Sequence, residues 1–287
     1  MALDYRCIQC FEKSFTRLVN KYSLSKSNEA VFAVYFRQVL EKNTDLTTPE
    51  IQRLLQHKLR QLTGIKDPFE EEKLAGNNTA LRLYDFWKPE VLQSNDPFRL
   101  ALKLAIAGNI MDYAADFDFN INETIGQVLK SRFAINHSKL LKKKIQQAQR
   151  ILYLGDNAGE IVFDKLFIEI MMHPEVTYAV RGGPAINDAT LDDALMIGMC
   201  EVADVVSNGF DAASTIIDKC SENFRTKFDN ADLIISKGQG NLEGLIGDND
   251  PRIFFLLMVK CDVIADTLKV KKGSIVVLNN EKHHGKY

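Results

Sequence analysis

One loop of the sequence carries side-chain oxygens where a phosphate-binding loop is usually bare. The segment Gly155–Glu160 reads Gly-Asp-Asn-Ala-Gly-Glu and follows the apolar run Ile151–Leu154. A loop that cradles a phosphate by itself uses glycines and backbone N–H groups, and a carboxylate there would repel the anion. A divalent cation between Asp156 and the anion removes this conflict, because carboxylate and carboxamide oxygens suit Mg²⁺ or Mn²⁺. On spacing alone, Asp156 and Asn157 could equally cap the helix that follows.

Asp188 and Lys260 occupy comparable positions after two other apolar runs. Asp188 follows the run Val176–Val180 and precedes a predicted helix. It is therefore a candidate third oxygen ligand, and its alternative role is to cap that helix. Lys260 ends the apolar run Ile253–Val259. A buried lysine needs an anionic partner, which Asp156, Asp188 or a bound phosphate would supply.

The segment Lys237–Asn241 follows a fourth apolar run and contains two glycines. Gly238 and Gly240 allow a ligand to approach the backbone closely. Lys237 could act as a point charge for phosphate. A tight turn would explain the same Gly-x-Gly pattern, so this motif does not by itself require a ligand.

The N-terminal segment contains a C-x-x-C motif, Cys7 and Cys10, whereas Cys200, Cys220 and Cys261 are isolated. Zinc or an iron–sulfur cluster would need further thiolate or imidazole ligands. A redox pair is a second interpretation, although the usual strand-to-helix setting is missing. Two buried apolar cysteines on a helix are the third.

Asn109 and Asp112 are the remaining polar candidates. They are three residues apart in an apolar stretch of the first half, so they share a helix face. On that face they could line a cleft between two domains or make structural hydrogen bonds.

The elements that must position these residues change type near residue 147. Residues 1–147 carry helix-period patterns, and Thr48-Pro49 opens one helix with Thr48 as its N-cap. From residue 148 onward, short β-type runs alternate with helical stretches, which predicts a mostly parallel sheet with helices on both faces. Ligands of such sheets bind beyond the carboxyl ends of the strands. The predicted strands are Ile151–Leu154, Val176–Val180, Asp204–Val206, Leu233–Ser236, Ile253–Val259 and Ser274–Leu278.

The fold class predicted is therefore α/β. We expect a Rossmann-like catalytic domain over residues 148–287, preceded by an all-helical domain over residues 1–147. The second domain would hold the metal ion.

Composition excludes several classes of partner. The 287 residues include 36 Lys+Arg and 38 Asp+Glu, a net charge of −2, which argues against a large basic face for nucleic acid. No apolar run reaches the roughly 18 residues of a membrane span. The segment Met1–Cys7 contains an acid and no apolar core of a signal peptide, so we expect a cytoplasmic protein with reduced thiols. Composition does not indicate an oligomeric state.

In order along the chain, these motifs resemble those of the damage-control phosphatase family, in its microbial branch with an N-terminal C-x-x-C. The resemblance covers nearly the whole chain. In chain order the segments are Cys7–Cys10, Asp67–Phe69, Asn77–Leu81, Asp96-Pro97, Gly108–Asp112, Gly155–Glu160, Asn187–Thr190, Lys237–Asn241 and Lys260-Cys261.

The resemblance implies a metal-dependent phosphatase with a helical N-terminal domain and a Rossmann-like α/β domain. It places the metal ligands on Asp156, Asn157 and Asp188. The substrate and phosphate contacts that it implies are Glu160, Lys237, Gly238, Gln239, Gly240, Asn241 and Lys260, and Asn109 fits the family pattern.

Two segments depart from the eukaryotic branch of that family. An Arg-Thr-x-Lys motif there corresponds to Leu257–Lys260 here, so only Lys260 matches. An aspartate there corresponds to Gln239. We therefore do not carry over the substrate range of the eukaryotic branch.

The expected reaction is hydrolysis of small phosphometabolites such as sugar phosphates, nucleotides or damaged phosphate esters. One divalent ion (magnesium, manganese, cobalt or nickel), held by Asp156, Asn157 and Asp188, would orient the ester and neutralise its charge. Lys260 and the amides of Gly238–Gly240 would hold the remaining phosphate oxygens.

Two alternatives belong to other classes. The first is an S-adenosylmethionine-dependent carboxyl methyltransferase, an activity attached to eukaryotic relatives. Its cofactor usually lies on a glycine-rich loop with no metal, so Asp156 and Asn157 argue against it. The second is a non-catalytic binding module stabilised by a metal ion on Cys7, Cys10 and Cys261.

Overall fold

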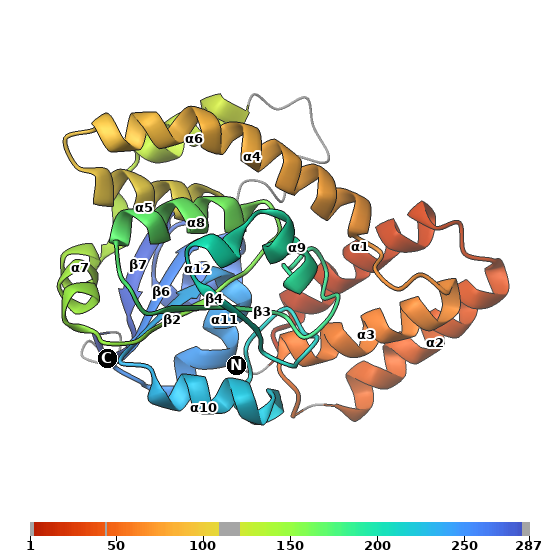
Figure 1. Cartoon of the computed structure of the whole chain (residues 1–287). Coiled ribbons are helices and arrows are strands. Elements are labelled where there is room, and N and C mark those ends of the chain that lie inside the picture. The colour runs from red at the N-terminus through yellow and green to blue at the C-terminus, as the bar shows by residue number, and fades with distance from the viewer. Residues whose placement is uncertain (1–2, 44, 109–120, 283–287) are drawn as a thin grey trace.

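The computed structural model describes residues 3–43, 45–108 and 121–282 (Figure 1). Its centre is a seven-stranded sheet in the order β1-β7-β6-β5-β2-β3-β4. The β6–β7 pair is antiparallel and the other neighbouring pairs are parallel. The strands are β1 (Phe133–Asn136), β2 (Ile151–Leu154), β3 (Val176–Val180), β4 (Asp204–Ser207), β5 (Leu233–Lys237), β6 (Ile253–Met258) and β7 (Ile275–Asn279).

A helical N-terminal region precedes the sheet, and further helices alternate with the strands, so the predicted fold class is confirmed. The N-terminal helices are α1 (Tyr5–Lys21), α2 (Lys26–Lys42), α3 (Thr48–Thr63), α4 (Glu70–Gln93) and α5 (Pro97–Ala107). The later helices are α6 (Ile121–Lys130), α7 (Ser138–Gln147), α8 (Glu160–Met171), α9 (Leu191–Met196), α10 (Glu222–Asn230), α11 (Gly238–Leu245) and α12 (Asp262–Leu268). Short 3-10 turns cover η2 (Met199–Glu201), η3 (Ile217–Lys219), η4 (Ile246–Asp248) and η5 (Asn280–Lys282).

The strands in the middle of the sheet are mainly apolar because both of their faces are covered. In β2, Ile151 and Tyr153 join the core under α4, α5 and α8, while Leu152 and Leu154 join the core under α10, α11 and α12. This alternation follows from the two-residue period of a strand. It leaves the carboxyl ends of β2, β3, β5 and β6 as the place where side chains can leave the core.

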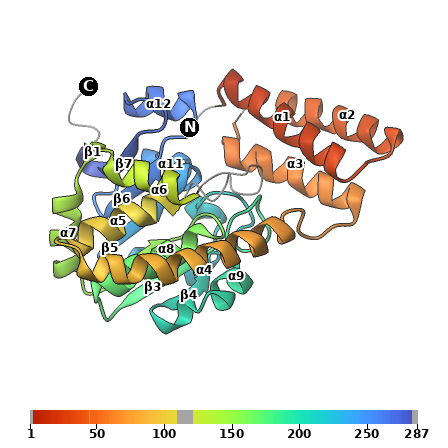
Figure 2. The same ribbon diagram turned by 90° about the horizontal axis from the view of Figure 1, so that it is seen from above.

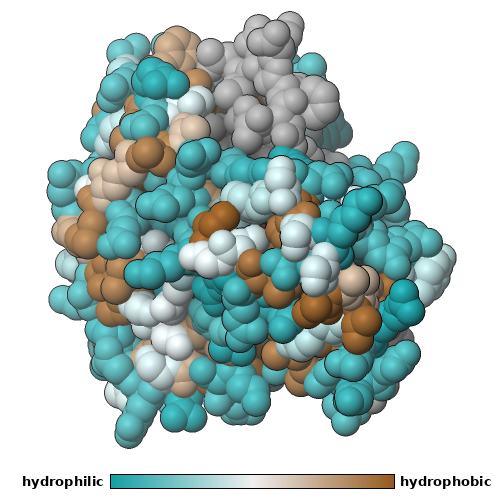
Figure 3. All heavy atoms as spheres, turned by 90° about the vertical axis from the view of Figure 1, so that its right-hand side faces the viewer, coloured by the Kyte–Doolittle hydropathy of each residue, from teal (hydrophilic) through white to brown (hydrophobic). Residues whose placement is uncertain are grey.

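Helices α1–α3 form a separate apolar core that includes Phe11, Phe32 and Leu55. Figure 2 shows these three helices stacked beside the sheet, with α4 running from them across α8. On the face turned outward from them, hydrophobic residues form small groups among hydrophilic ones (Figure 3). Among the described helices, none is both long and apolar enough to cross a bilayer.

One ionic contact fixes α3 to the sheet. Asp211, in the loop after β4, accepts hydrogen bonds from Arg53 Nε at 2.5 Å and Arg60 Nη2 at 3.0 Å, and lies 2.7 Å from His57 Nε2. These contacts lower the pKa of Asp211 although burial opposes them. The helical region is therefore held over the carboxyl edge of the sheet.

Two local expectations differ from the structure. The N-cap of α3 is Thr47 and not Thr48, because Glu50 accepts from both the N–H (2.9 Å) and the hydroxyl (2.8 Å) of Thr47. Strand β1 lies within the half expected to be all-helical and pairs with β7. Its residues Phe-Ala-Ile-Asn include a single β-branched side chain and lie between two helical stretches, so they give little strand signal. The boundary at residue 147 stays a prediction.

Candidate active site

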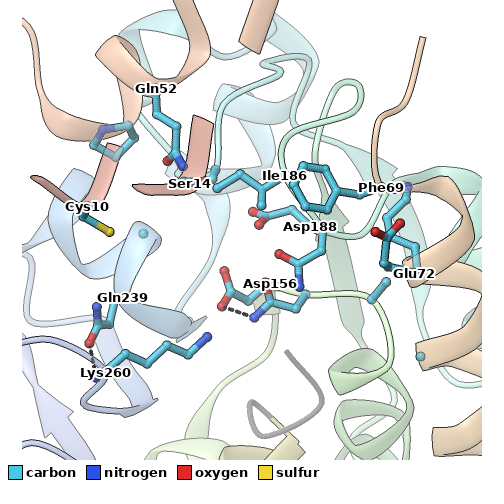
Figure 4. A pocket seen from close by; sticks show the side chains of 18 of the residues that line it. Cys10, Ser14, Gln52, Phe69, Glu72, Asp156, Ile186, Asp188, Gln239 and Lys260 are labelled. Carbon is cyan, nitrogen blue, oxygen red and sulfur yellow. Dashed lines mark hydrogen bonds between the residues drawn. The ribbon is translucent and has the colours of Figure 1, made fainter. Parts of the chain in front are cut away.

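A cavity of about 630 Å³ opens at the carboxyl ends of β2, β3, β5 and β6. Loops of the sheet form its inner wall, and α1, α3 and the start of α4 form its outer wall (Figure 4). The predicted site residues that line it are Asp156, Asn157, Asp188, Gln239, Gly240 and Lys260, together with Cys10. Asn109 and Asp112 lie outside the described residues.

A backbone bridge holds the two acidic loops together. Asn157 pairs with Asp188 in an isolated antiparallel bridge. The N–H of Ala189 donates to the carbonyl of Asp156 at 2.8 Å. Because the loops are joined here, Asp156, Asn157 and Asp188 reach the same wall of the cavity.

Arg181 is buried between the two carboxylates. Its Nε donates to Asp188 Oδ2 at 2.5 Å, its Nη2 lies 3.4 Å from Asp156 Oδ1, and its Nη1 donates to Asn241 Oδ1 at 2.8 Å. The sequence motifs do not single out Arg181. Its position directly after the apolar run Val176–Val180 could have identified it, because Lys260 was identified by the same kind of position.

The pKa values of both aspartates are raised. Burial raises the pKa of Asp156 well above its usual range, and the nearby carboxylates of Asp188 and Glu160 raise it further. Burial also raises the pKa of Asp188, although the charge of Arg181 opposes that rise. A bound cation would relieve this repulsion.

Lys237 lies behind the cavity wall. Its Nζ donates to Glu160 Oε1 and Asp164 Oδ1, both at 2.6 Å, and to the carbonyl of Ala105 at 2.8 Å. The side chain is fully buried and is not among the groups that line the cavity. Its position makes it the counter-ion of two buried carboxylates.

Glu160 connects this lysine to the cavity wall. Asn157 Nδ2 donates to Glu160 Oε2 at 3.1 Å and to Asp156 Oδ2 at 3.0 Å. Glu160 is 1% exposed and, like Lys237, lies behind the lining. Lys237 therefore fixes Glu160, and Glu160 fixes the side chain of Asn157.

A buried tyrosine pair completes this network. The hydroxyls of Tyr153 and Tyr178 each donate to Asp164 at 2.8 Å. Burial raises the pKa of Asp164 to about 6, while the charge of Lys237 acts against that rise. Each tyrosine is the one aromatic residue of its strand, and this was the available sequence signal for the pair.

Lys260 points into the cavity on the side of Asp156 (Figure 4). Burial lowers its pKa to about 7. The side-chain oxygen of Gln239 accepts from the N–H of Lys260, and its nitrogen contacts Cys261 Sγ at 3.6 Å. Gln239 thus anchors the loop that carries Lys260.

The residues that follow β5 are each required for a different structural reason. Gly238 has a φ of 74°, and a Cβ there would lie 1.9 Å from Asp156 Oδ2. A Cβ at Gly240 would lie 1.9 Å from the carbonyl oxygen of Ala213, so that glycine serves chain packing. Asn241 donates to the carbonyls of Gly155 (3.1 Å) and Lys237 (2.8 Å) and joins two loops.

We predict that Gly238→Ala lowers activity by about 10²-fold, because the new methyl group displaces the Asp156 carboxylate by more than an ångström. Gly64→Ala is the matched control, since Gly64 has the same φ of 74° but no atom within 4 Å of its would-be Cβ. Both variants should lose about 1–2 kcal/mol of stability from the left-handed backbone, and Gly238→Ala should lose more because its methyl group also clashes with Asp156. Equal activities of the two variants in a phosphate-release assay would contradict this explanation.

The C-x-x-C motif lies at the start of α1, and Cys10 lines the cavity. Cys7 is half-buried and Cys10 is exposed, so the interpretation as two buried cysteines is wrong. Partial desolvation raises the pKa of both thiols, and the nearby groups of Glu243 and Cys261 raise both further. Within residues 3–43, 45–108 and 121–282, no group of three or more His, Cys, Asp or Glu side chains is arranged to hold a metal ion. A metal or redox role for Cys7, Cys10 and Cys261 stays a prediction.

The family model described as damage-control phosphatase ARMT1-like domain matches residues 3–276. The chain belongs to this family. The matched range includes α1, the helical outer wall and every loop of the inner wall. Every residue that lines the cavity therefore lies within the match to the damage-control phosphatase family.

Archaeal relatives agree with the family assignment. A damage-control phosphatase of Pyrococcus horikoshii is 34% identical over 98% of this chain and 99% of its own length. A damage-control phosphatase of Archaeoglobus fulgidus is 32% identical over 93% of this chain and 88% of its own length. The crystal structure of the Pyrococcus protein matches with a TM-score of 0.90, covering 98% of this chain and all of that one.

Proposed function

We propose that this chain is a divalent-metal-dependent phosphatase that hydrolyses small phosphorylated metabolites in the cavity between the sheet and helices α1, α3 and α4. The concentration of buried carboxylates at the inner wall carries the proposal. Four buried carboxylates lie together with two buried cations on and behind this wall, and such a concentration of carboxylates favours the binding of a divalent cation. The carboxylates are Asp156, Glu160, Asp164 and Asp188, and the cations are Arg181 and Lys237, each at most 7% exposed.

The donor set fits a hard cation. Asp156, Asn157 and Asp188 offer carboxylate and carboxamide oxygens on one wall, as Mg²⁺ and Mn²⁺ prefer. When bound there, the ion supplies charge neutralisation and polarisation of a phosphate oxygen. The names of the Pyrococcus and Archaeoglobus relatives support a phosphatase activity.

The chain's own residues bind and orient the ester. Lys260 contributes an ammonium group to a phosphate oxygen, and the first turn of α11 at Gly238–Gly240 presents backbone N–H groups to an anion. Arg181 contacts both aspartates and positions them, and Glu160 orients Asn157. The contacts of Glu160 and Lys237 therefore favour positioning roles for both over direct substrate contact.

The testing experiment measures phosphate release by the purified protein from sugar phosphates, nucleotides and damaged phosphate esters. Each substrate is offered with Mg²⁺, Mn²⁺, Co²⁺ or Ni²⁺ and again with EDTA. We expect release from at least one substrate with metal and none with EDTA. Methyl transfer from S-adenosylmethionine to a carboxyl group, with no phosphate release, would replace this proposal by the methyltransferase alternative.

The pH dependence tests the role of Lys260. Because its pKa is lowered to about 7, its ammonium group is present below pH 7 and is lost above it. We expect kcat/KM to fall above pH 7 in the wild type and to persist to higher pH in Lys260→Arg, which stays charged. In Lys260→Gln, kcat/KM should fall by about 10- to 100-fold at pH 6, where Lys260 of the wild type is protonated. Identical pH profiles of wild type and Lys260→Arg would rule out this role.

A further inference from the structure

The side chain of Ile186 enters the cavity from a backbone conformation that isoleucine rarely adopts. Its φ is 51°, in the left-handed region where Gly, Asn and Asp are usual and β-branched residues are outliers. The N–H of Asp188 donates to the carbonyl of Ala185 at 3.0 Å and closes a four-residue turn. Ile186 occupies the second position of this turn, where a positive φ normally selects glycine.

Helix α3 holds the turn in this conformation. The N–H of Ile186 donates to Oε1 of the buried Gln56 at 3.0 Å. Arg60 Nη1 lies 3.4 Å from the carbonyl of Pro184. The unfavourable backbone is therefore maintained by the helical wall of the cavity.

The protein interior does not account for the choice of isoleucine. In the described part of the chain, Ile186 belongs to none of the three apolar clusters, and its half-buried side chain lines the cavity. A glycine would fill the turn without strain. Strain that persists without a packing reason is typical of sites that contact a ligand.

Phe69 presents a second apolar surface to the same cavity. It immediately precedes α4, packs partly against the core of α1–α3, and its ring reaches the cavity together with Ile186 (Figure 4). Ile186 is two residues from Asp188, so this apolar surface adjoins the proposed phosphate site. The rest of the wall is mixed: it includes the polar side chains of Lys13, Arg17, Gln52, Glu72, Thr79 and Asn187 as well as the apolar ones of Leu18 and Pro49.

We propose that Ile186 and Phe69 form a subsite for an aromatic or heteroaromatic ring on the alcohol part of the substrate. The inference rests on the proposed function and adds the substrate class. An aromatic side chain and an aliphatic one bind the faces of a planar ring through dispersion and water exclusion. A cavity of about 630 Å³ has room for such a ring beyond the phosphate.

Two non-hydrolysable phosphonates test the subsite without the complication of leaving-group reactivity. Calorimetry with Mn²⁺ present would measure the binding of phenylphosphonate and methylphosphonate to the wild type, Ile186→Gly and Phe69→Ala. We expect both variants to bind phenylphosphonate about 10-fold more weakly and methylphosphonate within about twofold of wild type. Ile186→Gly should also melt at an equal or higher temperature, because the left-handed strain is removed.

Met172→Gly is the matched control, since Met172 has a φ of 50° but caps α8 and is 86% exposed. It should gain similar thermal stability and bind both phosphonates normally. Equal weakening of both phosphonates in Ile186→Gly, or a lower melting temperature, would show that Ile186 is structural. Wild-type protein that binds the two phosphonates equally would overturn the subsite alone, whereas binding of neither would overturn the proposed function with it.

Discussion

Asp156→Asn is expected to abolish metal-stimulated phosphate release, with a loss of about 10³-fold. The substitution keeps the shape of the side chain but removes one of the negative charges that face the cavity. Without metal, the variant should melt at an equal or higher temperature than the wild type. The reason is that burial and the neighbouring carboxylates raise the pKa of Asp156, so its ionised form destabilises the metal-free fold near neutral pH.

Asp211→Asn is the control, because this substitution should change thermal stability in the opposite direction. The pKa of Asp211 is lowered by Arg53, His57 and Arg60, so its carboxylate stabilises the fold above its unfolded pKa. This variant should lose stability near neutral pH and keep its response to metal. Phosphate release and thermal melting with and without Mn²⁺ separate the two outcomes. Wild-type phosphate release by Asp156→Asn would contradict the proposed metal site.

Lys237→Met is expected to cost about 3–5 kcal/mol of stability, because it leaves two buried carboxylates without their counter-ion. Glu160 and Asp164 are at most 1% exposed, so water cannot replace the lysine. The pKa of Asp164 is already raised to about 6 and should rise further in the variant. A carboxyl with a raised folded pKa loses stabilisation as pH increases, so the deficit should be larger at pH 8 than at pH 5.

Lys165→Met is the matched control for this prediction. Lys165 is also buried, but Glu201, which accepts from its Nζ at 2.7 Å, has a side chain that is 73% exposed. Lys165→Met should therefore lose clearly less stability than Lys237→Met, because water solvates the carboxylate of Glu201. Denaturant unfolding at pH 5 and pH 8 measures both variants. Equal deficits in the two variants, independent of pH, would contradict the counter-ion role of Lys237.

Sequence periodicity predicts most of the sheet because its central strands are buried on both faces. The β6 run Ile253–Met258 is almost wholly apolar, so its position needs no tertiary information. The same rule brings Asp156, Asp188 and Lys260 together, since the carboxyl ends of parallel strands meet at one edge. Strand β1 escapes prediction because it holds a single β-branched residue, Ile135, and lies between two helical stretches, whereas the equally short edge strand β4 contains Val205 and Val206.

The depth of each side chain behind the cavity wall depends on tertiary packing. Lys237 shares a sheet face with Leu233 and Ile235, which places its amine under α8 and not in the cavity. The sequence motif correctly groups Lys237 with Glu160, but spacing cannot distinguish a phosphate contact from a buried ion pair. Likewise, Cys10 reaches the cavity only because α1 packs beside α3 over the carboxyl edge of the sheet.

Titration of Mn²⁺ into wild type and Asp156→Asn, with phosphate release followed at each metal concentration, tests the central claim most directly. We predict one Mn²⁺ per wild-type chain, phosphate release that rises with occupancy, and loss of both in Asp156→Asn. Phosphate release that persists in EDTA, or Mn²⁺ binding that is unchanged in Asp156→Asn, would contradict a catalytic metal ion at Asp156, Asn157 and Asp188.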